Sequence, residues 1–389
     1  MMQNFLMNKK ELSSFMKDKS ANELNVWHTH QDQVSTVSED FSVTYRKTSK
    51  GLTASLCEQT INLEEPALLE SVDIEKPWGK EIWYTGVEER GESRVKTSED
   101  TSIPLSLYLS LAPDQISNNL LPLLLKVLAP LPTEPKGNLY FEVHEKKEEV
   151  YIVTHIDQKA WPNGIGAIRY GVNQEKRKQY VSDEKFRLAY LETVKQYEKL
   201  RKKIDKGLEI DPELERKAKK DMNAFTTIKK IQLGDVIRVP TWVPHSLQHG
   251  VRVVEFQTPT YERFIISFEQ KVLTQKNWDS EYAIKRMHLD PPIELGPSNQ
   301  SPGIERLADF SSFSAIKVDF SQINHFNLSN TTNYAICLPI GTTCRVGDLI
   351  VPPETACLIP NKSLDQCEIH GESGGYALIA SPSIQQGAA

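Results

Sequence analysis

The stretch Gly234-Asp-Val-Ile-Arg-Val-Pro-Thr-Trp-Val-Pro-His245 is the most informative part of this sequence. A glycine suited to a turn precedes five residues with the apolar alternation of a β-strand. Pro240 then ends the strand's hydrogen bonding, because proline has no N–H to donate. Pro244 restricts the backbone just before His245, so we expect this imidazole on a rigid segment. The stretch therefore predicts a strand followed by a fixed histidine.

A second group of polar residues, Glu142-Val143-His144 followed by Glu148, stands roughly a hundred residues earlier. On a strand, residues two apart point to the same face, so Glu142 and His144 can enter one cavity. Glu148 can return to the same region after a turn. Two imidazoles and two carboxylates suit Zn, Mn, Fe, Co or Ni. We predict that Glu142, His144, Glu148 and His245 hold one divalent metal ion.

Three points about these residues stay open in the sequence. Glu149 could take the place of Glu148, although the spacing from His144 and the Glu-x-Val-Tyr run favour Glu148. Glu142 could be a solvated acid at the start of a strand. A second His-x-His, at residues 28–30, has no glutamate at a suitable distance, and we do not expect it to bind metal.

The two segments resemble the paired motifs of the cupin superfamily. The second motif, Gly-x5-Pro-x-Gly-x2-His, is matched from Gly234 to His245, with Trp242 at the second glycine. Within that superfamily the chain most resembles the type I mannose-6-phosphate isomerases. That resemblance rests on Glu75-Lys76-Pro77-Trp78-Gly79, Leu121-Pro122-Leu123-Leu124-Leu125-Lys126, Ala167-Ile168-Arg169-Tyr170-Gly171-Val172-Asn173, and Glu255-Phe256-Gln257 followed by Arg263. One departure is Glu142, which stands where the family has glutamine.

The resemblance implies a mainly β protein with two cupin-like jelly-roll β-barrels and a helical insertion. It implies an isomerase that interconverts mannose 6-phosphate and fructose 6-phosphate through a cis-enediol, with the metal as Lewis acid. Lys146 and Arg263 would be the catalytic residues, both suited to a sugar phosphate as the small-molecule partner. The base would be Glu142, if it is not a ligand, or Lys146. The cofactor would be one divalent ion, zinc first, with Mn, Fe, Co or Ni as alternatives.

Two other functions remain compatible with these motifs. One is a metal cupin that acts on another sugar or sugar phosphate as an isomerase or epimerase, or an oxygenase of the same fold. The other is a non-catalytic cupin that binds sugar. Turnover of a sugar phosphate separates the first function from the second.

Changes in composition and in the pattern of apolar residues along the chain predict its domain organisation. Residues 1–73 form an N-terminal extension packed on the first barrel, and 74–275 form a metal-binding cupin domain. A helical insertion at about 182–223 interrupts that domain. Residues 276–313, rich in Pro, Ser and Asp, form a connecting segment, and 314–389 form a C-terminal, metal-free cupin-like domain.

The helical insertion has clear local signals. Apolar residues from Phe186 to Ile204 recur at three- and four-residue steps, as an amphipathic helix requires. Ser182 is a suitable N-cap and Gly207 a suitable stop. Pro212 suits the first position of a second helix.

Composition indicates an ordinary globular protein. The chain has 389 residues, of which 39% are hydrophobic and 25% charged, enough for a large core in two or three domains. A net charge of −6 argues against nucleic acid or an anionic membrane as the main partner. Without an apolar block of signal-peptide length, we predict a cytoplasmic protein. Four of the five cysteines lie in the C-terminal β region, where we expect buried, reduced thiols.

Overall fold

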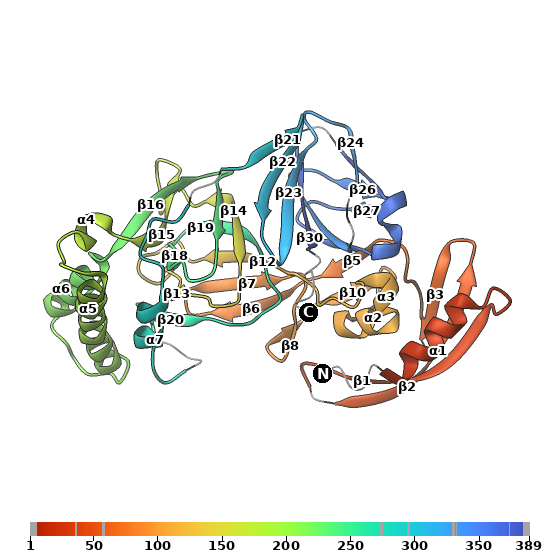
Figure 1. Ribbon diagram of the computed structural model, residues 1–389, viewed down its shortest axis with the longest axis horizontal. Helices are drawn as coiled ribbons and strands as arrows, with labels where there is room; N and C mark the ends of the chain where they lie inside the picture. The colour runs from red at the N-terminus through yellow and green to blue at the C-terminus, as the bar shows by residue number, and fades with distance from the viewer. Residues whose placement is uncertain are drawn as a thin grey trace. The chain divides into compact units, whose positions relative to one another are not determined.

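The computed structural model describes residues 6–35, 37–56, 59–271, 275–293, 296–328, 331, 333–372 and 374–383 (Figure 1). Strands arranged in several sheets dominate it, so the predicted mainly β class is confirmed. The chain divides into two compact units. One contains Met1–Ile74, Trp83–Lys126 and Pro297–Ala389, and the other contains Glu75–Ile82 and Val127–Gly296. We call them the terminal unit and the central unit. No described helix has the length and apolar character needed to cross a membrane.

The central unit contains both metal-motif segments in two sheets. The six-stranded sheet has the order β17 (Val236–Val239), β14 (Glu149–Ile156), β19 (Val251–Gln257), β12 (Leu124–Pro130), β7 (Gly79–Trp83) and β6 (Val72–Lys76). The five-stranded sheet has the order β16 (Thr226–Gln232), β15 (Ile165–Val172), β18 (His245–Leu247), β13 (Phe141–Val143) and β20 (Phe264–Ser267). Buried side chains of both sheets form one hydrophobic core, with Val153 from the first and Ile168 and Leu247 from the second. Inward side chains from either sheet therefore reach a common interior.

Gly79 shows why the Lys-Pro-Trp-Gly segment ends in glycine. Its φ is +146°, a conformation that side chains rarely adopt. A Cβ at this position would lie 2.3 Å from the carbonyl oxygen of Ala129 in β12. Only glycine allows β7 and β12 to approach this closely.

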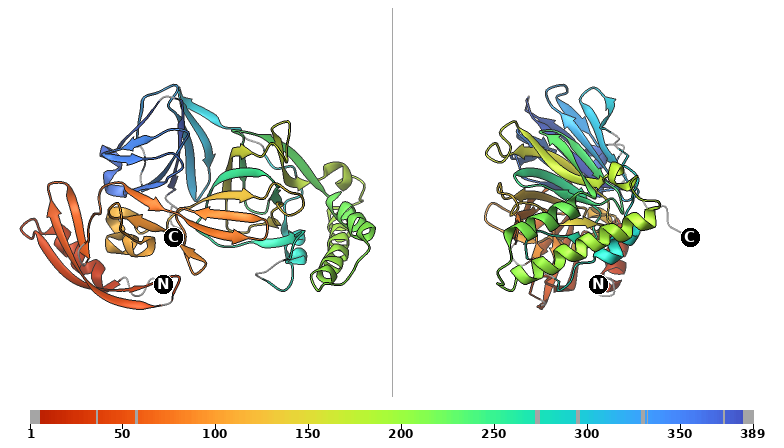
Figure 2. Two further views of the ribbon diagram at one scale, coloured as in Figure 1. Left: turned by 180° about the vertical axis from the view of Figure 1, so that it is seen from behind. Right: turned by 90° about the vertical axis from the view of Figure 1, so that its left-hand side faces the viewer.

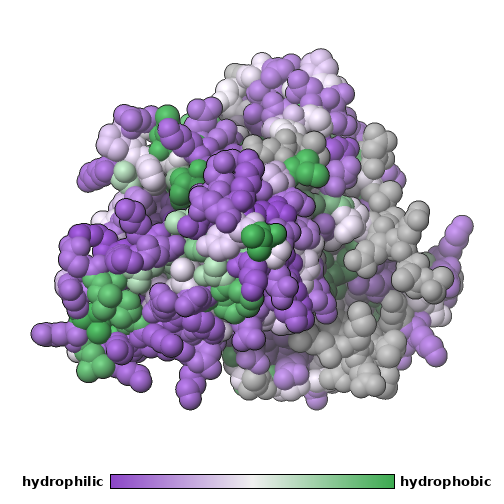
Figure 3. Space-filling model, turned by 60° about the vertical axis from the view of Figure 1, so that its left-hand side comes forward, coloured by the Kyte–Doolittle hydropathy of each residue, from purple (hydrophilic) through white to green (hydrophobic). Residues whose placement is uncertain are grey.

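A helical insertion joins β15 to β16, which themselves pair from Ile165–Gln232 to Val172–Thr226. It consists of α4 (Gln174–Arg177), α5 (Asp183–Ile204) and α6 (Pro212–Asn223). Figures 1 and 2 show α5 and α6 side by side at one end of the unit, and Figure 3 shows a mostly hydrophilic surface on that side. A seventh helix, α7 (Ser280–Arg286), packs on β20 and α5.

The sequence signals for the two long helices are confirmed. The Ser182 hydroxyl accepts a hydrogen bond from the backbone N–H of Lys185 at 3.2 Å and caps α5. The Asp211 carboxylate accepts from the N–H of Glu213 at 2.9 Å and caps α6, which begins at Pro212. The predicted apolar stripe is buried, with Phe186, Tyr190, Val194 and Tyr197 inside.

The terminal unit begins with α1 (Leu6–Lys17) and a four-stranded sheet of β1 (Glu23–Gln31), β2 (Ser38–Thr48), β3 (Gly51–Leu56) and β4 (Gln59–Asn62). A nine-stranded sheet has the order β11 (Ser102–Pro104), β10 (Arg94–Lys96), β5 (Ala67–Glu70), β28 (Cys357–Ile359), β25 (Ala335–Ile340), β30 (Tyr376–Pro382), β23 (Phe313–Asp319), β22 (Ile304–Asp309) and β21 (Ser298–Ser301). Another four-stranded sheet has the order β24 (His325–Asn327), β29 (Glu368–Gly371), β26 (Cys344–Val346) and β27 (Leu349–Val351). The remaining elements are the hairpin β8 (Val87–Glu88) and β9 (Gly91–Glu92), α2 (Leu105–Leu111), α3 (Pro113–Ile116) and the 3₁₀ helix η1 (Asn361–Gln366).

The N-terminal part of the chain shares a compact unit with its C-terminal part. Residues 1–73 belong with the C-terminal strands, not with the segment that carries the metal motifs. The reason is long-range pairing, because β5 hydrogen-bonds to β28 on one side and to β10 on the other.

The predicted connecting segment 276–313 is also structured. It contains α7 and the strands β21 and β22. These elements are short and lie in a Pro- and Ser-rich stretch, so the sequence shows no clear helical or strand periodicity for them.

The cysteine prediction is confirmed within the described residues. Cys337, Cys344, Cys357 and Cys367 are buried, free thiols in the core of the terminal unit. Cys57 lies outside the described residues.

Candidate metal centre

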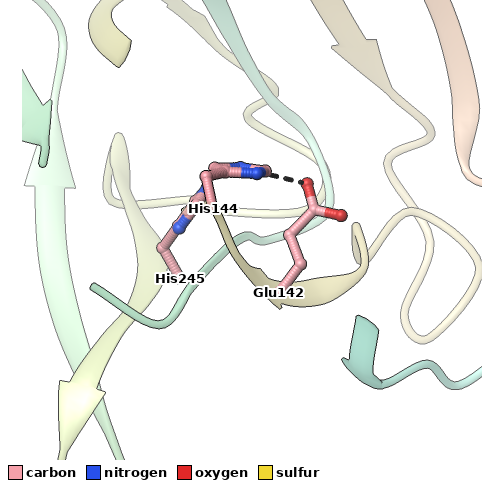
Figure 4. Close-up of side chains that lie close together, drawn as sticks. All are labelled: Glu142, His144 and His245. Carbon is pink, nitrogen blue, oxygen red and sulfur yellow. Dashed lines mark ion pairs between the residues drawn. The ribbon is translucent and has the colours of Figure 1, made fainter. Parts of the chain in front are cut away.

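Three of the four predicted ligands meet in the interior of the central unit. Glu142 lies on β13, His144 directly follows that strand, and His245 begins β18. β13 and β18 pair with Glu142 opposite His245. One ligand atom from each of the three side chains lies within 4.8 Å of the others, and Figure 4 shows them converging. Glu142 Oε1 and His144 Nε2 are 3.8 Å apart.

The fourth side chain of this group, and its second carboxylate, is Glu149 and not the predicted Glu148. Glu149 Oε2 lies 3.1 Å from His245 Nε2, and Glu149 Oε1 lies 3.5 Å from His144 Nε2. Glu149 is the first residue of β14 and is buried, whereas Glu148 is half-buried and its backbone N–H donates to Thr258 Oγ1 at 3.1 Å. Neighbouring residues of an extended chain point to opposite faces, so only one of the two glutamates can face inward.

His144 and His245 both point their Nε2 atoms toward the carboxylate of Glu149. His144 Nδ1 bonds to the carbonyl oxygen of Glu262 at 2.8 Å, and His245 Nδ1 to that of Val243 at 2.9 Å. A carbonyl only accepts, so the proton is assigned to Nδ1 and each Nε2 keeps a lone pair. Within the described structure both Nε2 atoms and Glu142 Oε2 are buried without a hydrogen-bond partner.

These orphaned atoms fit a cation. The 3.1 Å approach of Glu149 to His245 is an ion pair by distance, yet His245 Nε2 makes no hydrogen bond of acceptable geometry. Because the proton of His245 is held on Nδ1 by the Val243 carbonyl, Glu149 Oε2 and His245 Nε2 are two electron-rich atoms that face each other. Imidazoles oriented by a backbone carbonyl on their other nitrogen are typical metal ligands. The residues present therefore fit a divalent metal ion.

Glu149 is held at both oxygens. Oε1 lies 2.5 Å from Lys147 Nζ, and Oε2 accepts a 2.9 Å hydrogen bond from the Tyr151 hydroxyl. Burial alone would raise the pKa of Glu149, but Lys147 and the two histidines outweigh it and hold that pKa well below its usual range. The carboxylate is therefore ionised, as a metal ligand must be.

The charges around Lys147 explain why an ammonium group is tolerated in the interior. Burial works to lower the pKa of Lys147, but the carboxylates of Glu149, Glu255 and Glu142 together raise it. Burial lowers the pKa of His144, with Lys147 adding to the effect. The pKa of His245 is raised, because Glu149 outweighs the opposing effect of burial.

The lysine in the interior is Lys147 and not Lys146, the predicted catalytic residue. Lys146 is exposed, and its backbone N–H donates to Glu262 Oε2 at 2.8 Å. Lys147 is buried, with 7% of its surface exposed, and occupies the interior position beside Glu149. The Lys-x-Glu pattern expected at 146 and 148 is thus realised at 147 and 149.

Arg263, the other predicted catalytic residue, contacts the ring of Tyr140. Its guanidinium carbon lies 4.4 Å from the centroid of the Tyr140 ring. Burial raises the pKa of Tyr140, Arg263 opposes this rise, and the charge of Glu142 adds to it. Arg263 itself is half-buried.

Sequence reasoning named Glu149 as an alternative ligand but gave no role to Tyr151, Glu255 or Gln257, which are buried on the same two strands. β14 and β19 pair with Glu149 opposite Gln257 and Tyr151 opposite Glu255. All four side chains are buried. A polar residue at every second position of two otherwise apolar strands was the signal that could have found them.

Trp242 explains how the second motif works without its second glycine. Its φ is +62°, the left-handed conformation that favours glycine. Its backbone N–H donates to the carbonyl oxygen of His144 at 2.7 Å, which ties the two motif segments together. Its ring stacks on Phe264 with centroids 6.1 Å apart. Hydrogen bonding and aromatic packing thus hold a backbone conformation that a tryptophan rarely adopts.

The second His-x-His lies in the terminal unit. His28 Nε2 is 3.1 Å from the Tyr45 hydroxyl, and His30 Nε2 is 3.2 Å from Ser106 Oγ.

Comparison with solved structures identifies the fold. A mannose 6-phosphate isomerase from Bacillus subtilis matches with a TM-score of 0.57 and 17% identity, over 81% of this chain and 99% of its own. The enzyme from Salmonella typhimurium, bound to its substrate and a zinc atom, matches with a TM-score of 0.61 and 12% identity, over 82% of this chain and 100% of its own. No family model and no curated protein sequence matches the chain. The chain therefore has the fold of the mannose 6-phosphate isomerases.

Proposed function

We propose that this protein is a metal-dependent aldose–ketose isomerase that interconverts mannose 6-phosphate and fructose 6-phosphate through a cis-enediol. The observation that carries the proposal is the pair of buried imidazole Nε2 atoms, which face ionisable carboxylates and have no hydrogen-bond partner in the described structure. We further propose that both units are built on cupin-like jelly-roll barrels, and that only the central one holds a metal.

The proposed ligands are Glu142, His144, Glu149 and His245, with Glu149 in the place first assigned to Glu148. Two neutral imidazoles and two carboxylates suit zinc, and also Mn, Fe, Co or Ni. When bound, the ion would supply Lewis-acid stabilisation of negative charge on the sugar oxygens.

Lys147 provides a fixed positive charge next to the ligands. Its raised pKa keeps it an ammonium group at neutral pH, so it can donate hydrogen bonds to a developing oxyanion but cannot act as the base. Lys146, exposed outside the interior, does not occupy this position.

Glu255 is a buried carboxylate outside the proposed ligand set. It is buried opposite Tyr151, and its charge acts on both Lys147 and Tyr151. We assign to it the transfer of a proton between the two sugar carbons. Arg263 offers a planar guanidinium that matches the oxygens of a phosphate group.

A coupled isomerase assay on mannose 6-phosphate tests this proposal. We expect turnover that is lost on chelation, returns with Zn, Mn or Co, and is absent in His245→Ala. His249→Ala serves as a matched control, because His249 bonds to Asn138 outside the ligand set. Unchanged turnover in His245→Ala would contradict the proposal. Turnover of a different sugar phosphate would show that the substrate is not mannose 6-phosphate. Saturable binding without product would identify a non-catalytic sugar-binding protein.

A further inference from the structure

The terminal unit contains a cavity of about 400 Å³, a volume typical of small-molecule sites. Five strands of the two C-terminal sheets, β21, β22, β23, β24 and β30, supply its walls together with neighbouring loops. It is lined by Gln300, Ile304, Arg306, Ser314, Ile316, Phe326, Leu328, Thr331, Ile379, Ser381, Pro382 and Ser383. Six of these residues are apolar, five are uncharged and polar, and one is charged. The cavity is independent of the metal centre, whose residues all belong to the other unit.

Strand register places the floor of this cavity on one face of the sheet. Arg306 of β22 is opposite Ile316 of β23, which is opposite Ile379 of β30. Residues directly opposite one another in antiparallel strands share a face. The guanidinium side chain therefore stands in one row with two isoleucines.

The next row is polar. Ser314 of β23 is opposite Ser381 of β30. Phe326 contributes an aromatic wall from β24, a strand of the other sheet. The cavity thus combines an apolar floor and wall with a hydroxyl-bearing margin.

The ion pair between Arg306 and Asp309 is weak. Arg306 Nη1 lies 3.4 Å from Asp309 Oδ1, and the Asp309 side chain is 67% exposed against 34% for Arg306. An ion pair of this length with an exposed acid adds little stability. A carboxylate inside the cavity would compete with this exposed acid for the guanidinium through a charge-assisted, two-pronged hydrogen bond.

We propose that this cavity binds a small monocarboxylate with an apolar body. One guanidinium matches one carboxylate group, and the isoleucine and phenylalanine surfaces match a hydrocarbon chain or ring. A sugar phosphate fits less well, because those of its hydroxyl groups that face the isoleucine and phenylalanine side chains would have no partners. A polyanion such as nucleic acid would meet only one cationic side chain in the described lining.

Isothermal titration of the full chain with sodium octanoate tests the proposal, with octanamide as the uncharged analogue of the same length. We expect octanoate to bind one site per chain, and octanamide to bind at least about tenfold more weakly. Arg306→Gln should remove this difference. Arg345→Gln is the matched control, because Arg345 is an exposed arginine of the same unit that lies outside the cavity lining.

A second variant keeps the test informative if the first one unfolds. Ser314→Phe adds bulk at a half-buried position of the cavity and should abolish octanoate binding without touching the guanidinium. Equal affinity for octanoate and octanamide, binding unaffected by either substitution, or no heat of binding at millimolar octanoate would each overturn the proposal. Isomerase activity plays no part in these outcomes, so the metal-centre proposal stands or falls separately.

Discussion

Lys147 Nζ lies 2.5 Å from Glu149 Oε1, and both side chains are buried beside the two histidines. The two residues are two apart, so an extended chain turns them to the same face while Lys146 and Glu148 face elsewhere. This pair fixes which of two adjacent lysines and two adjacent glutamates belong to the interior. It therefore fixes the residues that experiments should change.

Replacing Glu149 by glutamine should weaken metal binding by about 100-fold or more, because a buried anionic ligand becomes a neutral amide. Competition with a chromophoric chelator measures the dissociation constant for zinc. Glu148→Gln makes the same chemical change one residue away and should leave that constant within about twofold. Equal losses in the two variants would show that Glu149 acts only through its charge.

Lys147→Met should lower kcat by roughly 10²–10⁴-fold, the range associated with loss of a catalytic acid, base or oxyanion donor. Lys146→Met should change kcat by less than about twofold, because Lys146 is exposed. Steady-state assays on metal-loaded protein make the comparison, with metal content measured in the same samples. A larger effect at residue 146 would argue against the assignment to residue 147.

Tyr151→Phe should raise the dissociation constant of the metal by about 10–100-fold, the usual effect of removing a hydrogen bond to a ligand. The variant keeps the ring but loses the 2.9 Å hydrogen bond to Glu149 Oε2. Tyr170→Phe is the matched control, since the Tyr170 hydroxyl donates to the carbonyl oxygen of Arg238 instead. The visible spectrum of the cobalt-loaded protein should change in the first variant and not in the second.

His28 should make the stability of the terminal unit depend on pH. Burial, aided by the charge of His30, lowers the pKa of His28 from 6.5 to about 4. Between these values the unfolded chain binds more protons than the folded one, so the free energy of unfolding falls as pH falls from 6.5 toward 4. The loss should reach about 3 kcal/mol at most.

His28→Phe provides the measurement for this effect. It keeps an aromatic ring against Phe41, whose centroid lies 5.8 Å away, and removes the titrating group. Urea unfolding of both proteins at about pH 6.5 and about pH 4.5 should show a smaller loss of stability in the variant. Identical losses would mean that the pKa of His28 is the same in the folded and the unfolded chain.

Local signals predicted most residues of the candidate metal centre. His144 and His245 are fixed by short spacings and by prolines, and α5 and α6 by their caps and apolar stripes. Such features depend on residues a few positions apart, and the sequence displays them directly.

Two features depended on strands far apart in the sequence: which glutamate faces inward, and to which unit residues 1–73 belong. Glu149 faces inward because β14 pairs with β17 and β19, where Val239 and Gln257 lie opposite it. Nothing within Lys146-Lys147-Glu148-Glu149 distinguishes the two possible registers. The place of residues 1–73 likewise depends on pairing between β5 and β28, at opposite ends of the chain.

The helical insertion has a consequence for engineering. β15 and β16 pair along their length at its base, and Gly207, between α5 and α6, has open space around the position of a Cβ. A chain cut at Gly207 would yield one fragment with Glu142, His144 and Glu149, and another with His245. On the ligand set proposed above, neither fragment could complete the metal site alone. Metal uptake would then report the reassembly of two polypeptides, which makes this chain a starting point for a split sensor.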